Sequence, residues 1–238
     1  MENPERDYSP FNQRLSDEAI NEDDDYAKLT EVREFENNPD KVVRVNAIAP
    51  PYTYEDSDLV DLKELRQMTV QNAKDAKFLF GKLDNYLTLP HYNFVVSENP
   101  EARDYPTLYT VTDRVYGEPL DDAMDRTDSP VSNEQLDQLF HSVIAYYKSV
   151  PESGGSYLTD IPKLSQFMYG HTGEDPTDKI YFVDLDLMHA TYGKSESEVN
   201  AFVSRLHKIR AMITEATRLR GDIFTAAITE LDDLREQV

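Results

Sequence analysis

Two carboxylates close a short apolar segment, and their spacing is the first sign of possible chemistry. The segment Ile180-Tyr-Phe-Val has the composition of a strand, and Asp184 and Asp186 follow it. In an extended chain, residues two apart point to the same face, so both carboxylates can bind one Mg²⁺ through oxygen ligands. A strand-end aspartate can equally cap the next turn, and the residues alone leave both interpretations open.

Several other kinds of site are excluded or disfavoured. The chain has no cysteine, which excludes disulfides, thiolate catalysis and cysteine-bound zinc. Its five histidines form no close pair at helical or His-x-His spacing, and neither Gly-x-Ser-x-Gly nor a P-loop is present. The fifteen tyrosines are scattered, which favours packing roles.

The charge balance restricts the class of partner. The chain has 46 acidic and 24 basic residues, a net charge of −22. This charge repels nucleic-acid backbones and anionic membranes, so no direct nucleic-acid binding is expected. It favours a basic protein, a cationic small molecule or divalent metals, or a role as a nucleic-acid mimic. No apolar stretch approaches the roughly 18 residues of a membrane span, and the N-terminus lacks a signal peptide, so a cytoplasmic protein is expected.

Residues 1–27 are polar and acidic, with the run Glu22-Asp-Asp-Asp25. Like charges repel and little can be buried, so a flexible arm is predicted. Such an arm is most often a solvated tail without function, and docking onto a basic partner is the rarer alternative.

The segment that follows the arm predicts a hairpin and a long helix. Residues 29–35 and 41–48 have strand composition, and the Asn, Pro and Asp of 36–40 favour a turn between them. A helix is predicted at 58–86 because apolar and small residues recur at spacings of three and four. This predicted buried stripe comprises Leu62, Leu65, Thr69, Asn72, Ala76, Leu79 and Leu83.

Strands are predicted at 92–97 and 107–116, the second closed by Gly117, and their short connection favours antiparallel pairing. The second half is predicted to be mostly helical around a short hairpin. Its helices are placed at 132–149, 195–220 and 222–236, and its strands at 167–169 and 179–184.

This order of elements resembles the two-lobed protein-kinase-like fold, in particular the aminoglycoside phosphotransferase and choline kinase branch. The segments that carry the resemblance are Val42-Val-Arg-Val, Thr110-Val-Thr-Asp-Arg-Val-Tyr-Gly-Glu-Pro-Leu and Ile180-Tyr-Phe-Val-Asp-Leu-Asp. The resemblance implies an α+β fold, with a small antiparallel sheet and a long helix in an N-lobe at 28–116 and a mostly helical C-lobe at 117–238.

The resemblance also implies a set of site residues, with ATP and Mg²⁺ as cofactors. Arg44 takes the place of the basic residue that contacts nucleotide phosphates, and Glu64 that of its helical partner. Asp160 is the counterpart of the catalytic base. The implied nucleotide-binding residues are Arg44, Glu64, Asp113, Arg114 and Val115, and the implied metal ligands are Asp184, Asp186 and Gln166.

The chain departs from the family pattern at catalytic positions. All eight glycines lie at position 81 or later, so the first strand pair has no glycine-rich phosphate loop. No histidine stands two residues before an aspartate, and Asp160 precedes Gln166 by one residue too many. These departures favour a degenerate, pseudokinase-like protein, or weak nucleotide-binding module, that acts through protein interactions. The alternatives are an active phosphotransferase for a cationic small molecule and an acidic interaction or nucleic-acid-mimic protein.

Overall fold

The chain divides into two compact units. The computed structural model describes residues 30–47, 62–97, 107–153, 155–159, 161–185, 189–193, 195–221 and 224–238. Unit 1 comprises Met1–Phe78 and His91–Arg114, and unit 2 comprises Leu79–Pro90 and Val115–Val238. The predicted α+β class is confirmed, because the described residues hold small antiparallel sheets and five α-helices.

Unit 1 contains a four-stranded antiparallel sheet of order β1-β2-β4-β3. Its strands are β1 (Thr30–Phe35), β2 (Asn38–Ala47), β3 (Tyr92–Ser97) and β4 (Thr107–Asp113). The predicted hairpin and the antiparallel pairing of the later two strands are both confirmed. One face forms a small core of Phe35, Val43, Val45 and Tyr109, as the two-residue period of a strand requires.

The hairpin between β1 and β2 is tighter than its sequence suggests. Phe35 pairs with Asn38, so the turn is Glu36-Asn37 rather than 36–40. The next pair is Glu34 with Val42, which leaves 39–41 outside the β1–β2 ladder as a bulge. The bulge contains Pro39. Proline has no N–H to donate to a ladder, and strands tolerate it at bulges.

Helix α1 (Leu62–Leu83) runs from unit 1 into unit 2. The predicted stripe is buried at Thr69, Ala76, Leu79 and Leu83, and Phe80 is buried with it. The predicted start at residue 58 lies outside the described residues. After the helix, Leu87 N–H donates to Leu83 O at 3.0 Å, which turns the chain toward β3.

The predicted strand at 107–116 is in fact two strands in different sheets. β4 ends at Asp113, and β5 (Val115–Pro119) pairs with β7 (Phe167–Thr172), which also pairs with β8 (Lys179–Phe182). Gly117 therefore lies within a strand and does not close one. It faces Gly170 so closely that a Cβ at Gly117 would lie 2.8 Å from the Gly170 Cα.

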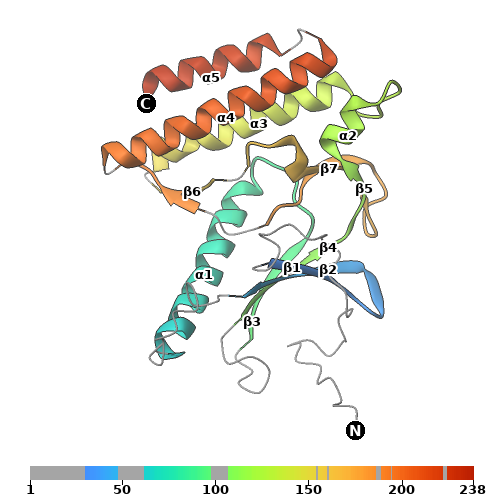
Figure 1. Cartoon of the computed structure of the whole chain (residues 1–238), viewed down its shortest axis with the longest axis vertical. Coiled ribbons are helices and arrows are strands. Elements are labelled where there is room, and N and C mark those ends of the chain that lie inside the picture. Colours follow the sequence, from blue (N-terminus) through green and yellow to red (C-terminus); the bar gives the residue numbers. More distant parts are fainter. Residues whose placement is uncertain are drawn as a thin grey trace, which may run out of the picture. The chain divides into compact units, whose positions relative to one another are not determined.

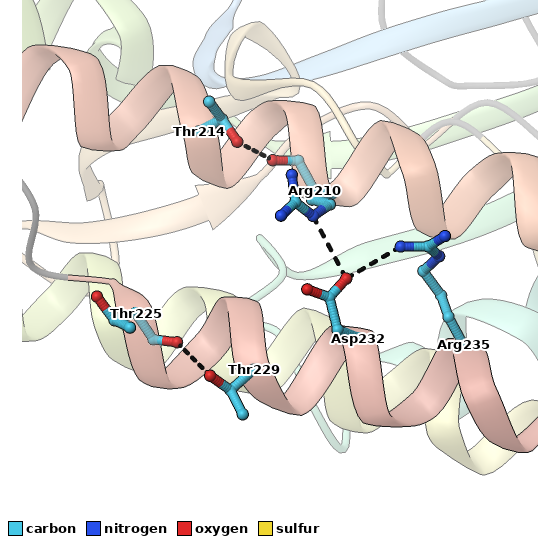
Figure 2. Close-up of polar contacts among 6 residues, drawn as sticks. All are labelled: Arg210, Thr214, Thr225, Thr229, Asp232 and Arg235. Atoms are coloured by element: carbon cyan, nitrogen blue, oxygen red, sulfur yellow. Dashed lines mark hydrogen bonds and ion pairs between the residues drawn. The ribbon is translucent and has the colours of Figure 1, made fainter.

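Four helices lie wholly within unit 2. They are α2 (Leu120–Asp125), α3 (Asn133–Ser153), α4 (Glu196–Arg220) and α5 (Thr225–Gln237). The long helices α3, α4 and α5 lie side by side (Figure 1). Asp232 of α5 accepts from Arg210 of α4 at 3.3 Å and from Arg235 of its own helix at 3.0 Å (Figure 2). No helix in the described ranges is long and apolar enough to span a bilayer.

Two predicted helix starts are confirmed by their caps. Ser132 Oγ accepts from Gln135 N–H, and Gln135 Oε1 accepts from Ser132 N–H in return. Ser195 and Glu198 form the same reciprocal capping box before α4. Each box satisfies two backbone donors that a helix terminus would otherwise leave unpaired.

Strand β6 (Ser156–Leu158) pairs with β9 (His189–Thr191), which is a pair that the sequence did not suggest. The buried phenols of α3 hold β6 in place. Leu158 N–H donates to Tyr146 Oη at 3.0 Å, and Tyr147 Oη donates to Leu158 O at 2.9 Å. The strand therefore leads into residues 159–166 from a fixed position.

Candidate functional site

Gln166 and Asp184, eighteen residues apart in sequence, meet in unit 2. Gln166 closes the short 3₁₀ helix η1 (Leu164–Gln166) just before β7, and Asp184 follows β8. Gln166 Nε2 donates to Asp184 Oδ2 at 3.0 Å, and Val183 N–H donates to Gln166 O at 3.1 Å. The side chains are thus brought together by a backbone contact between the two segments.

The Gln166 amide leaves one acceptor unsatisfied. The residue is 9% exposed, and its Oε1 is buried without a hydrogen-bond partner among the described residues. Rotating the amide would set Oε1 against the Asp184 carboxylate, because the carboxylate can only accept. An unpaired buried acceptor costs about 1–3 kcal/mol, so this oxygen calls for a donor or a cation. A carbonyl oxygen beside a carboxylate suits a hard cation such as Mg²⁺.

The other predicted residues near this pair are not described. Asp160 and Asp186 lie outside the described residues, and their roles as base and metal ligand stay predictions. Among the residues that are described, no three His, Asp or Glu side chains gather as a metal-binding group. The described part of the predicted metal set is therefore one carboxylate and one amide.

In unit 1, Arg44 lies at the middle of β2, opposite Val32 of β1 and Thr110 of β4. Because Val43 and Val45 face the core, Arg44 points to the other face of the sheet, where it is half-buried. Glu64 lies in the first turn of α1, and its side chain is outside the described residues. The ion pair between Arg44 and Glu64 stays a prediction.

Two of the predicted nucleotide-binding residues, Asp113 and Arg114, carry ion pairs within unit 1. Asp113 is 6% exposed and binds Lys41, and its N–H donates to His91 O at 2.9 Å. Arg114 binds Glu34 of β1. Sequence reasoning missed both partners, which lie 72 and 80 residues away along the chain.

Val115, which was predicted to bind nucleotide with Asp113 and Arg114, begins β5 opposite Thr172 and is buried. The division between the units falls between Arg114 and Val115. The three consecutive residues therefore have different surroundings: two are held by charges of the first sheet, and the third belongs to the β5–β7–β8 sheet. Their role in nucleotide binding stays a prediction.

No protein-family model matches the chain, and no curated protein matches it. Among solved structures, the chain is similar to "WaaP in complex with acyl carrier protein", with a TM-score of 0.36 and 10% sequence identity. The similarity covers 92% of this chain and 89% of that one. The element order of this chain is itself consistent with the predicted two-lobed kinase-like fold.

Proposed function

We propose that this chain is a degenerate kinase-like protein that binds Mg²⁺–nucleotide weakly and acts through protein contacts rather than by turnover. The observation that carries the proposal is the contact between Gln166 and Asp184, with the buried Oε1 of Gln166 left without a partner in the described part of the chain. Both side chains offer hard oxygen atoms, which fit Mg²⁺. A bound Mg²⁺ would supply charge neutralisation for the phosphates.

The donor set supports weak binding. Mg²⁺ is commonly held by one or two carboxylates together with substrate phosphates. Here Asp184 supplies one carboxylate, whose Oδ2 already accepts from Gln166, and the Gln166 amide is neutral. The protein's role at this pair is to keep two oxygen donors in place, and most of the binding would come from the phosphates.

The first hairpin argues against turnover. Its turn, Glu36-Asn37, has no glycine to bring backbone N–H groups close to a phosphate. Residues 30–47 hold four acidic and three basic side chains, so the hairpin offers a phosphate no net positive charge. Phosphoryl transfer depends on positioning and charge neutralisation, and the turn of this hairpin provides neither.

Unfolding midpoints with Mg²⁺–ATP test the proposal. Ligand at ten times its Kd stabilises a protein by about 1.4 kcal/mol. For weak binding with a Kd of about 1 mM, this concentration is about 10 mM Mg²⁺–ATP, which should raise the unfolding midpoint by a few degrees. The Asp184→Asn variant should lose this rise, because the amide can still accept from Gln166 but no longer carries charge. Asp233→Asn, on the exposed face of α5, removes the same charge elsewhere and should keep the rise.

Two results would overturn the proposal. An equal midpoint rise in wild type and Asp184→Asn would place the nucleotide elsewhere, and no rise at all would leave a protein without a nucleotide site. Metal-dependent ATP consumption with an aminoglycoside or choline-like amine would instead favour the alternative of an active phosphotransferase.

A further inference from the structure

Unit 2 contains a hollow of about 270 Å³ that is separate from the Gln166–Asp184 contact. It is bounded by the turn after α1, by one face of α3 and by the start of β8. Its lining residues are Tyr86, Leu87, Thr88, Gln135, Gln138, Leu139, Ser142, Lys179 and Ile180.

The walls of this hollow are fixed by contacts behind them. Phe182 N–H of β8 donates to Thr88 O at 3.0 Å, which ties the turn to the strand. The Tyr86 ring meets the buried Tyr146 edge-on at 5.8 Å. Gln135 is held by the capping box at the start of α3. The hollow is therefore formed before any ligand arrives, as small-molecule sites usually are.

Four polar side chains face the hollow without protein hydrogen-bond partners among the described residues. Tyr86 and Ser142 are half-buried, and Thr88 and Gln138 stand exposed at the rim. Together they offer three hydroxyls, each a donor and an acceptor, and one amide with both functions. Leu87, Leu139 and Ile180 supply apolar surface beside them.

The charges around the hollow exclude most ionic ligands. The chain has 46 acidic residues, but none of those that the structure describes lines the hollow, so they offer a cation no carboxylate there. Lys179, the one charged residue among the described lining residues, is paired with Asp175 at 2.5 Å. A net charge of −22 also repels anions.

We propose that this hollow binds an uncharged, hydroxyl-rich ring of monosaccharide size. The hydroxyls and the Gln138 amide pair with the hydroxyls of the ring, while the aliphatic side chains and the Tyr86 ring cover its C–H face. The volume is slightly below the range of about 300–1,000 Å³ that holds drug-sized ligands, which suits a single ring. The proposal does not depend on nucleotide binding.

Amide chemical shifts of the whole chain test it, with D-glucose, D-galactose and myo-inositol as probes. At least one probe should cause saturable shifts, with a Kd in the millimolar range, at residues 86–88, 135–142 and 179–180. Ser142→Val removes a hydroxyl and adds bulk, and Gln138→Ala removes the exposed amide. Each should weaken binding at least fivefold. Ser204→Val, on the exposed face of α4, is the matched control and should not change the affinity.

Three results would overturn the proposal: no saturable shift with any probe, shifts elsewhere, or unchanged affinity in both Ser142→Val and Gln138→Ala. Tighter binding of D-glucuronate or D-glucosamine than of the neutral sugars would refute the uncharged class. Asp184→Asn should keep sugar binding, so a failed nucleotide test and a failed sugar test remain distinguishable.

Discussion

At the residue scale, the side chain of Tyr146 both packs against other aromatic rings of unit 2 and forms a hydrogen bond. Its ring lies among other aromatic rings, edge-on to Tyr147 at 5.3 Å and to Tyr86 at 5.8 Å. Its hydroxyl accepts the N–H of Leu158. The side chain is fully buried, and this burial raises the pKa of the phenol to about 12.

That shift predicts a loss of stability in alkali. Between pH 10 and about 12 the unfolded chain releases a proton that the folded chain keeps, so each pH unit multiplies the unfolding equilibrium constant about tenfold. Below pH 10 both states hold the proton and the effect is absent. Urea unfolding at several pH values measures the slope.

Tyr146→Phe is the variant for this test. It removes one titrating proton and should flatten the slope, while the unpaired Leu158 N–H costs about 1–3 kcal/mol at every pH. Tyr192→Phe, whose ring packs on Phe202, should behave as wild type. An unchanged slope in Tyr146→Phe would assign the alkaline transition to other groups.

At this scale the sequence predicted local contacts better than distant ones. The Ser132 and Ser195 caps follow from residues three apart, which a helix start brings together. The Lys41–Asp113 pair joins strands far apart in the chain, and only the sheet register creates it. Gln166 and Asp184 were predicted as ligands of one site, and their contact is observed, although their role as ligands stays a prediction.

At the scale of elements, the backbones of β5 and β7 approach each other closely at a pair of glycines. Gly117 and Gly170 face each other, and a Cβ on either residue would penetrate the backbone of the other strand. Gly81, in the last turns of α1, has open space where its Cβ would be. Replacement by alanine is therefore expected to destabilise the protein at Gly117 and Gly170 and to stabilise it at Gly81.

Gly117→Ala should destabilise the protein by at least about 3 kcal/mol, because β5 would have to move away from β7. Gly81→Ala should stabilise it by roughly 0.5–1 kcal/mol, because alanine has the better helix propensity and meets nothing. Denaturant unfolding of both variants measures the difference. A mild effect at Gly117, similar to that at Gly81, would mean that the two strands are not held this close.

The prediction of a single strand at 107–116 was wrong because tertiary contacts, rather than local composition, end β4. Residues 107–116 are rich in Thr, Val and Tyr, and composition gives no reason to break the strand. The break at Arg114 is set by tertiary contacts: Arg114 N–H donates to Asp40 O at 2.7 Å, and its guanidinium binds Glu34. The long helices, by contrast, could be predicted from the spacing of apolar residues, because their buried stripes repeat over several turns.

At the scale of the whole molecule, negative charge is the dominant property. Residues 1–27 hold nine acidic and two basic residues, so a small part of the chain carries about a third of the net charge of −22. A basic partner would be attracted by this charge, and salt would screen the attraction. The interaction role in the proposed function favours such a partner.

Binding to a lysine-rich peptide at two salt concentrations tests the contribution of these residues. Replacing Glu22, Asp23, Asp24 and Asp25 by their amides should weaken binding at low salt and reduce its salt dependence. Amide replacement of Glu134, Asp137, Asp233 and Glu236, which lie on α3 and α5, is the matched control. If both variants lose affinity equally, overall charge rather than the N-terminal run attracts the partner.

The pairing of β5 with β7 also has a consequence for how the chain refolds. The two strands join Gly117 to Gly170, and α2, α3 and β6 lie between them in sequence. Closing so long a loop loses much chain entropy before any pairing energy is gained, whereas the β7–β8 hairpin closes locally. We therefore expect the amides of β7 facing β8 to gain protection from hydrogen exchange early in refolding, and those of β5 to gain it late.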